Sequence, residues 1–325
     1  ALERLVRLSR RTVVYSGAGI SASAVGQAAL SGTNTVGWKA GCARAAQPTR
    51  AHLALAALGR AGWLHGWVQQ NHDGLPQKAG FPQESLIEVH GSWFDPSNPV
   101  VKYSGSLKAA ECERMEREAE GADLALVLGT SLSGLNADQV AERAAGRAAG
   151  GESLGAAIVN LQQTPLDGGA SLRIFAAADE VLWALAEALG APPAARPPRP
   201  PLRPPQQRVL VPYDARGDRL APGSAQPHMW LDLSEGAAVR LHRGHNHAGA
   251  RQPSSRHVEG GEGRVVGYEA ATQSFRLAVE GAAMGLGAWW VEAAQRGGPQ
   301  SLPLVNAAPE FQHPGEREKG GKAGA

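Results

Sequence analysis

A chain of 325 residues is long enough for two domains, each with its own hydrophobic core. A formal net charge of +2 gives no electrostatic reason to expect direct nucleic-acid binding, and no apolar run approaches the ~18 residues of a membrane span. Cys42 and Cys112 form no C-x-x-C pair, which argues against a disulfide framework or a cysteine-based zinc site. The sequence therefore predicts an intracellular protein, cytoplasmic or nuclear, with no membrane partner.

The first 190 residues alternate short apolar runs with Ala-rich helical stretches. Such alternation favours an α/β fold with a doubly wound, mostly parallel sheet, a Rossmann-like arrangement. The predicted strands are Thr12–Tyr15, Trp67–Gln70, Asp123–Leu128 and Ala156–Asn160. The predicted helices are Pro48–Gly59, Ala137–Ala149 and Asp179–Leu189.

Composition changes abruptly at residues 191–207, where proline dominates. Proline lacks an amide donor and favours extended polyproline II, so this stretch is expected to be a stiff linker or a polyproline ligand for a partner. Beyond it, residues 208–308 show alternating runs such as Phe275–Glu280 and Val239–His242, which predict a small β-rich module, a barrel or sandwich. Met284–Ala294 fits a strand or a helix. Residues 309–325 are expected to be a disordered tail.

Four short motifs stand out within the N-terminal part. Gly17–Ser21 follows the first predicted strand, where glycines let the backbone approach a phosphate at a helix N-terminus. Gln70–Leu75 and Gly129–Leu132 also begin at strand ends, and Glu88–Gly91 carries a histidine that can accept a proton near neutral pH. Each motif alone is weak evidence, because Gly, Asn and Asp are ordinary turn residues.

Together, in this order, the four motifs resemble the sirtuin family, enzymes that consume NAD to remove acyl groups from lysine. The resemblance runs from Thr12 to about Gly190. It implies a sirtuin-type, Rossmann-like fold, NAD as the cofactor and an acylated-lysine protein or peptide as substrate. The products it implies are nicotinamide and O-acyl-ADP-ribose.

The resemblance also implies roles for individual residues. His90 would be the general base that deprotonates a ribose hydroxyl after the acyl oxygen has displaced nicotinamide, with Asn71 and Asp73 as the other catalytic residues. Glu88 is expected to orient His90. The implied NAD-binding residues are Gly17, Ala18, Gly19, Ile20, Ser21, Gln70, Asn71, Asp73, Gly129, Thr130, Ser131, Asn160 and Leu161. Val100–Gly105 resembles the strand that pairs with the substrate peptide, which implies substrate contacts at Val101, Tyr103 and Gly105.

The chain departs from the family pattern at three places. His72 replaces the usual apolar residue between Asn71 and Asp73. In the cofactor loop, best matched by Gly26–Gly32, the family's Asp, Phe and Arg become Ala29, Leu30 and Ser31, for which Lys39 or Arg44 could substitute.

The third departure concerns metal. Only residues 92–97 separate Gly91 from Asn98, too few for the four-cysteine zinc module of the family, so a zinc-independent protein is expected. The histidines His242, His245 and His247 fit a solvated loop better than a metal site, and no metal is predicted.

Three functions remain open on the sequence. The first is an NAD-dependent protein-lysine deacylase on a reduced sirtuin core. The second is a mono-ADP-ribosyltransferase or NAD glycohydrolase on the same core. The third is a non-catalytic NAD or ADP-ribose sensor. In each case the C-terminal module is expected to recognise a protein partner. Retention of Asn71, Asp73 and His90 favours the first function over the sensor.

Overall fold

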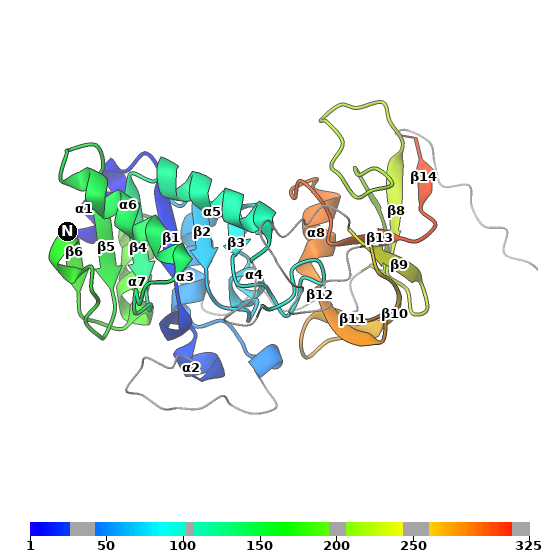
Figure 1. The fold of residues 1–325 in the computed structure, drawn as a ribbon, viewed down its shortest axis with the longest axis horizontal. Coiled ribbons are helices and arrows are strands. Elements are labelled where there is room, and N and C mark those ends of the chain that lie inside the picture. The colour runs from blue at the N-terminus through cyan, green and yellow to red at the C-terminus, as the bar shows by residue number, and fades with distance from the viewer. Residues whose placement is uncertain (27–42, 102–106, 195–205, 243–259, 314–325) are drawn as a thin grey trace, which may run out of the picture. The chain divides into compact units, whose positions relative to one another are not determined.

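The computed structural model describes residues 1–26, 43–101, 107–194, 206–242 and 260–313. The described residues divide into two compact units (Figure 1). Unit 1 comprises those up to residue 194, and unit 2 those from residue 206 onward. Most of the expected proline-rich linker, residues 195–205, lies outside the described residues.

Unit 1 is built on a six-stranded sheet of order β3-β2-β1-β4-β5-β6 in which every neighbouring pair is parallel. Strands β1, β2, β4 and β5 are buried along their whole length, as expected for a parallel sheet covered on both faces. This confirms the predicted doubly wound parallel sheet. The strands are β1 (Thr12–Ser16), β2 (Gly66–Gln69), β3 (Leu86–Glu88), β4 (Leu124–Leu128), β5 (Gly155–Val159) and β6 (Leu172–Ile174).

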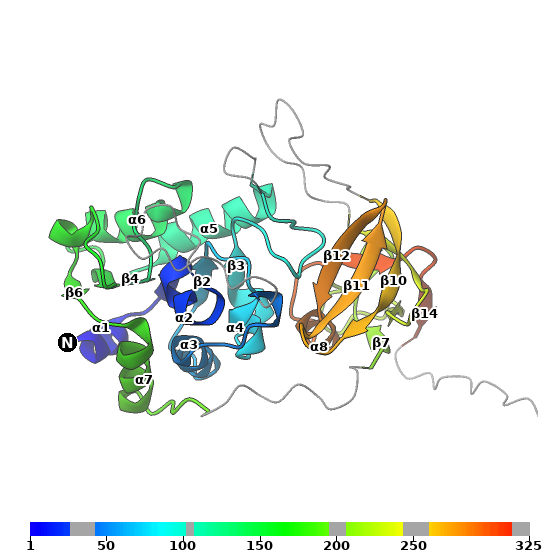
Figure 2. The same ribbon diagram turned by 90° about the horizontal axis from the view of Figure 1, so that it is seen from below.

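Helices cover both faces of this sheet (Figure 2). One apolar cluster joins α1, α3 and α7 to one face, and a second joins α5 and α6 to the other. Among the described residues, no helix combines the length and apolar character that crossing a membrane requires. The α-helices are α1 (Leu2–Leu8), α2 (Ala22–Val25), α3 (Arg50–Arg60), α4 (Leu75–Lys78), α5 (Ala109–Gly121), α6 (Gln139–Ala148) and α7 (Ala178–Ala188).

Two helices start later than the sequence indicates. Helix α3 begins after Thr49 rather than at Pro48, because the Thr49 hydroxyl lies 2.8 Å from His52 Nδ1 in a capping box that defines the first turn. Helix α6 begins at Gln139, because the Asp138 carboxylate accepts the amides of Gly134 and Leu135 at 2.8 and 2.9 Å and holds a 3-10 turn before it.

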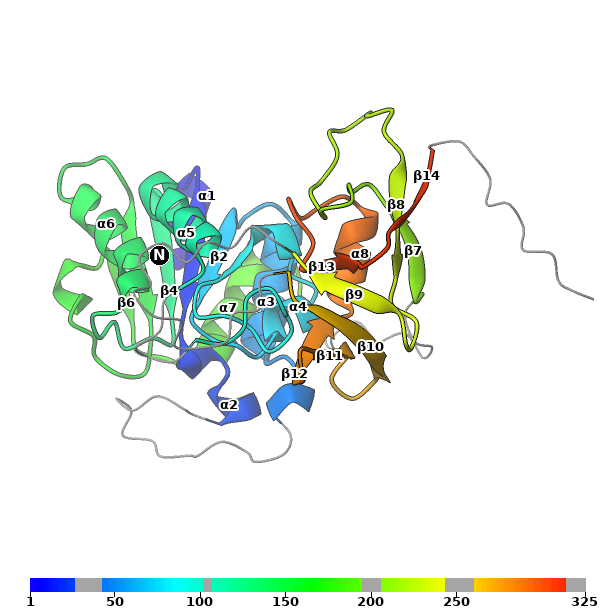
Figure 3. The same cartoon turned by 45° about the vertical axis from the view of Figure 1, so that its right-hand side comes forward.

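Unit 2 consists of antiparallel strands around its own core, in sheets of order β12-β11-β10-β9-β13 and β14-β8-β7 (Figure 3). The predicted β-rich module is therefore confirmed. Its elements are β7 (Arg208–Val211), β8 (His228–Asp232), β9 (Ala238–Leu241), β10 (Glu262–Glu269), β11 (Ser274–Val279), β12 (Ala282–Gly287), α8 (Trp289–Gln295), β13 (Leu304–Asn306) and β14 (Glu310–Gln312).

Unit 2 settles one open expectation and corrects another. Residues 284–294, which fit a strand or a helix, are divided between β12 and α8, with Ala288 at the junction. The expected disorder from residue 309 onward is wrong for Glu310–Gln312. These residues pair with β8, and Phe311 faces Met229 in the register. Residues 314–325 lie outside the described residues.

Candidate functional site

The candidate site lies where four neighbouring parallel strands end. The carboxyl ends of β3, β2, β1 and β4 share one edge of the sheet, so the residues that follow them come together there. Ligands bind at this edge in open α/β sheets. The chain places Gly17, Gln70, His90 and Gly129 within two residues of these strand ends.

The glycine turn after β1 packs directly against the end of β4. Gly19 donates its amide to the Gly129 carbonyl at 2.8 Å, and the Gly17 amide bonds to Leu128 O at 3.1 Å. A Cβ on Gly19 would lie 2.7 Å from Gly129 O, and one on Gly17 would lie 2.7 Å from Gln70 Oε1. Glycine is therefore required for the close approach of the two loops. Ile20 points into the apolar core, where it is buried.

Gln70 and Asn71 are held in place by hydrogen bonds from both sides. The Asn71 amide donates to Gly17 O at 3.1 Å and to Ser21 Oγ at 3.0 Å. The Gln70 amide donates to the Tyr15 hydroxyl, which in turn donates to Asp138 Oδ1 at 2.6 Å. These bonds fix the side chains of the loop after β2 before any ligand arrives.

Asp73 is buried, and only one of its two carboxylate oxygens has a hydrogen-bond partner among the described residues. Its Oδ1 accepts the Leu75 amide at 3.0 Å, which caps the short helix α4. Its Oδ2 is buried with no hydrogen-bond partner among the described residues. A buried, unpaired carboxylate oxygen is costly, so a polar ligand group that donates to it would be strongly favoured.

The candidate base His90 is half-buried beside a second histidine, His72. Burial is the largest influence on His90 and lowers its pKa, and the neighbouring His72 lowers it further, while the Gln70 backbone and Asp138 oppose the shift. Burial likewise lowers the pKa of His72. Both imidazoles are therefore neutral at pH 7, the form in which a histidine can accept a proton.

These residues line one cavity of about 240 Å³. It unites the expected residues Ala18, Ser21, Gln70, Asn71, Asp73 and His90. The wall also contains His72 from the Asn71–Asp73 motif, Gly26 from the expected cofactor loop, and two residues that the sequence did not single out, Val25 and Trp93. Trp93 carried a usable signal, because an aromatic residue three positions after the candidate base falls at the same sheet edge.

The remaining expected cofactor residues lie beside the cavity rather than in its wall. Thr130 packs against Gly17, and its hydroxyl lies 3.5 Å from Gln70 Oε1. Asn160 donates its side-chain amide to Thr130 O at 2.9 Å. Ser131 Oγ lies 3.0 Å from Ser133 Oγ, and Leu161 is 71% exposed. Asn160 thus ties the end of β5 to the end of β4.

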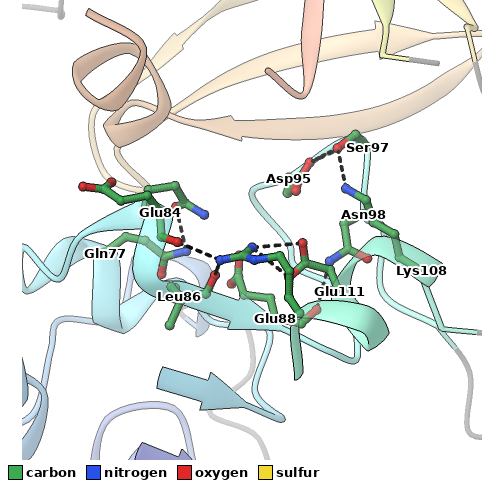
Figure 4. A network of polar contacts seen from close by, with 11 residues as sticks. Gln77, Glu84, Leu86, Glu88, Asp95, Ser97, Asn98, Lys108 and Glu111 are labelled. Carbon is green, nitrogen blue, oxygen red and sulfur yellow. Dashed lines mark hydrogen bonds and ion pairs between the residues drawn. The ribbon is translucent and has the colours of Figure 1, made fainter. Parts of the chain in front are cut away.

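Glu88 does not play the expected orienting role for His90. Its carboxyl oxygen accepts a hydrogen bond from Gln69 Nε2 at 3.1 Å, in a separate polar network shown in Figure 4. Burial, with Asp95 nearby, raises the pKa of Glu88 to about 8. Residues two apart on a strand share a face, but β3 ends at Glu88 and His90 lies in the turn after it, so this alternation does not extend to His90.

The same network closes the short segment where the resemblance predicts a missing zinc module. Asn98 donates its amide to Glu88 O at 2.9 Å, and the Ser92 amide bonds to Asn98 O at 2.8 Å. Asp95 Oδ1 accepts from the Ser97 amide and hydroxyl at 2.8 and 2.7 Å, and Lys108 donates to that hydroxyl at 3.2 Å (Figure 4). Hydrogen bonds thus close the loop after His90.

Some expected residues lie outside the described part of the chain. They are Ala29, Leu30, Ser31 and Lys39 of the cofactor loop, Tyr103 and Gly105 of the substrate segment, and His245 and His247. Of their neighbours, Arg44 lies over the Trp93 ring at 5.9 Å. Val101 belongs to no strand, and its amide donates to His90 O at 3.2 Å.

Within the described ranges, no group of three or more His, Cys, Asp or Glu side chains could hold a metal ion. His242, the described member of the C-terminal histidine set, is buried in unit 2. Its Nε2 lies 3.1 Å from Asp218 Oδ1. The carboxylate contact gives this imidazole a structural role within unit 2.

The chain is similar to curated NAD-dependent protein deacetylases, and no family model matches it. It is 30% identical over 227 residues to the NAD-dependent protein deacetylase SRT1 of Oryza sativa subsp. indica, covering 55% of this chain and 45% of that protein. Its identity to SRT1 of Arabidopsis thaliana is 30% over 235 residues, or 58% and 48% of the two chains. The chain thus spans about half the length of these relatives.

Solved structures show the same fold. A Sir2 protein bound to a propionylated peptide superposes with a TM-score of 0.50 at 22% identity, covering 58% of this chain and 98% of that one. A Sir2 variant with a deacetylated p53 peptide and 3'-O-acetyl ADP ribose gives a TM-score of 0.51 over the same shares. At this level of identity the likeness establishes the fold alone.

Proposed function

Because this chain belongs to the sirtuin family, we propose that it is an NAD-dependent protein-lysine deacylase. Nicotinamide and O-acyl-ADP-ribose would be its products. One observation carries the proposal: Asn71, Asp73 and His90 line a single cavity with Ala18 and Ser21 of the glycine turn. Three strand ends contribute to that cavity, and each contributes a residue type that the reaction requires.

The residues present fit NAD. The close packing of Gly17 and Gly19 against the loops after β2 and β4 brings Ala18 and Ser21 of the glycine turn into the cavity wall, at the strand-end edge where open α/β sheets bind dinucleotides. Asp73 Oδ2, buried and unpaired among the described residues, offers an acceptor for the amide of a carboxamide. When bound, NAD would supply the ribose carbon that the acyl oxygen attacks as nicotinamide leaves.

His90 is proposed as the general base and Asn71 as the group that positions the reacting ends. Burial keeps His90 neutral, so it can take a proton from a hydroxyl group within hydrogen-bond reach. Asn71 holds the loop after β2 against the glycine turn through its bonds to Gly17 and Ser21. Asp73 would orient the leaving carboxamide, because its Oδ1 is already committed to Leu75.

The substrate proposed is an acyl-lysine segment of a protein or peptide. Val101, whose amide is bonded to the backbone of His90, would begin the segment that pairs with that peptide. The antiparallel unit 2, which has a core of its own, is proposed to recognise a protein partner.

The test is release of nicotinamide from NAD, measured with and without acetylated and propionylated lysine peptides. Wild type is compared with His90→Ala and with the control His65→Ala, an exposed histidine just before the opposite end of β2. We expect release that depends on peptide, that falls by two to four orders of magnitude in His90→Ala on general-base estimates, and that is unchanged in His65→Ala.

Each alternative outcome has its own meaning. Release without peptide would indicate glycohydrolase or transferase chemistry. Binding of NAD without any release would indicate a sensor. Equal rates for wild type and His90→Ala would remove His90 from the mechanism.

A further inference from the structure

The loops after β2 and β3 are joined through His72, by its ring and by its backbone. His72 Nδ1 lies 2.9 Å from the Gly91 carbonyl oxygen. A second bond runs from the Trp93 amide to the His72 carbonyl at 3.0 Å. The Gln70 backbone, from the loop after β2, also raises the pKa of His90 on the loop after β3. The two bonds at His72 therefore form a brace between the loops beside the cavity.

The chemistry of the first bond fixes the protonation pattern of His72. A carbonyl oxygen can only accept, so Nδ1 of His72 must carry the hydrogen. In the neutral ring the lone pair is then on Nε2. An apolar side chain at this position, such as the sequence pattern of the family has, could donate no such bond. The brace is thus a property of this chain's own residue.

The bond from His72 is accepted by the carbonyl group of Gly91, a residue whose backbone has little freedom. Its φ is +84°, in the left-handed region, and a Cβ there would lie 2.4 Å from Pro99 O. His90 directly precedes it, and the His90 carbonyl is itself bonded to the Val101 amide. A donor that holds the Gly91 carbonyl therefore sets the direction in which the His90 side chain leaves the backbone.

We infer that His72 is a positioning residue for His90, acting through its Nδ1–H bond to the Gly91 carbonyl, and that it takes part in the proposed reaction by holding the base toward the cavity. This inference rests on the proposed function. It adds to the mechanism a residue that acts through the backbone beside the base.

The surroundings of the two rings give the brace a pH signature. His72 faces Asp73 on its own loop and the Trp93 ring, with centroids 6.3 Å apart, and Arg44 lies over that tryptophan. His90 faces His72 and Asp138, the latter from the 3-10 turn before α6. His72 lowers the pKa of His90, so replacing it with an uncharged residue should move the acid limb of the rate profile to higher pH.

The experiment compares three variants of the full chain. His72→Asn keeps a donor at the δ position, His72→Gln moves the amide one atom outward, and His72→Val removes it. We expect kcat for nicotinamide release to fall ~3- to 10-fold in the Val and Gln variants, the loss of one hydrogen bond, and to stay within about twofold in Asn. Tm should stay near wild type in all three, and the acid limb should move upward in Asn and Val.

Two outcomes overturn the inference: a Val variant with wild-type kcat and acid limb, or an Asn variant as slow as Val. A loss of Tm that parallels the loss of rate also overturns it, since the role is then structural. If wild type releases no nicotinamide, the proposed function fails, and imidazole NMR decides the brace separately. A neutral His72 with its proton on Nδ1 supports it, and one with its proton on Nε2 overturns it.

Discussion

The side-chain nitrogen of Asn71 lies 3.1 Å from the carbonyl oxygen of Gly17, so the loop after β2 is tied to the glycine turn after β1. The same nitrogen also reaches Ser21 Oγ at 3.0 Å. One amide therefore joins two loops that are more than fifty residues apart in the chain. The proposed phosphate-binding turn and the proposed nicotinamide pocket form a single preorganised unit as a result.

Asn71→Asp should separate the two loops with little change in side-chain volume. It removes both donated hydrogen bonds, each worth about 0.5–1.5 kcal/mol, and sets a carboxylate against the Gly17 carbonyl. Nicotinamide release should fall roughly 5- to 150-fold on that arithmetic. A steady-state assay with acetylated peptide measures this, and an unchanged rate would show that the tie is dispensable.

Gly17→Ala should weaken NAD binding without unfolding the chain. The added methyl would lie 2.7 Å from Gln70 Oε1 and 2.8 Å from Thr130 Cβ, so both cavity loops must shift. Overpacking of this kind costs ~1–3 kcal/mol, which corresponds to a loss of roughly 5- to 150-fold in affinity if it falls on the bound state. Calorimetric titration with NAD measures it.

Gly146→Ala is the matched control for that variant. Gly146 lies exposed on helix α6, and a Cβ there meets nothing within 4 Å. Its NAD affinity should equal that of wild type, and its stability should rise slightly, since alanine favours helix over glycine. Equal affinities for both alanine variants would contradict the role given to Gly17.

Glu88→Gln should flatten the dependence of stability on pH. Burial raises the pKa of Glu88 to about 8 in the folded chain from an ordinary value of 4.5, so the folded state binds the extra proton between these values. The free energy of unfolding should therefore fall as pH rises from 4.5 to 8, by up to about 1.4 kcal/mol per pH unit from this group. Urea denaturation at several pH values should show that this component is absent in the variant.

Ile87→Val separates that effect from a general loss of stability. Ile87 is buried on the same strand, and its truncation costs about 0.5–1.5 kcal/mol without removing an ionisable group. The variant should be less stable at every pH by the same amount. If Glu88→Gln instead kept the wild-type slope, the buried carboxyl would not be the source of the pH dependence.

Unlike Glu88, His52 should make the free energy of unfolding fall as the pH decreases. Complete burial lowers the pKa of His52 to about 4, against an ordinary value of 6.5, although Asp73 and Asp179 oppose the shift. The unfolded state then binds the extra proton between pH 6.5 and 4, so stability should fall as pH falls through that window. His52→Asn should lose this component of the slope, whereas Leu55→Ala in the same helix should be destabilised and keep it.

Local patterns predicted much of the fold. The continuous apolar run of β4 matches a strand buried on both faces, and the apolar-polar alternation of β11 matches a strand with one exposed face. Both strands lie within a residue or two of the expected bounds. Helix starts were less accurate. The caps formed by Thr49 with His52 and by Asp138 depend on side-chain bonds that composition does not reveal.

The sequence by itself determined which motifs lie at one edge of the sheet, because segments that follow neighbouring parallel strands must meet there. Only the tertiary structure decided what each side chain does there. In the folded chain Glu88 belongs to a separate buried network, and the His72 ring is bonded to the Gly91 carbonyl. Only one of the two carboxylate oxygens of Asp73 has a hydrogen-bond partner among the described residues. The physical reason is that burial and hydrogen-bond partners are set by atoms distant in the chain, whereas strand and helix periodicity is set by near neighbours.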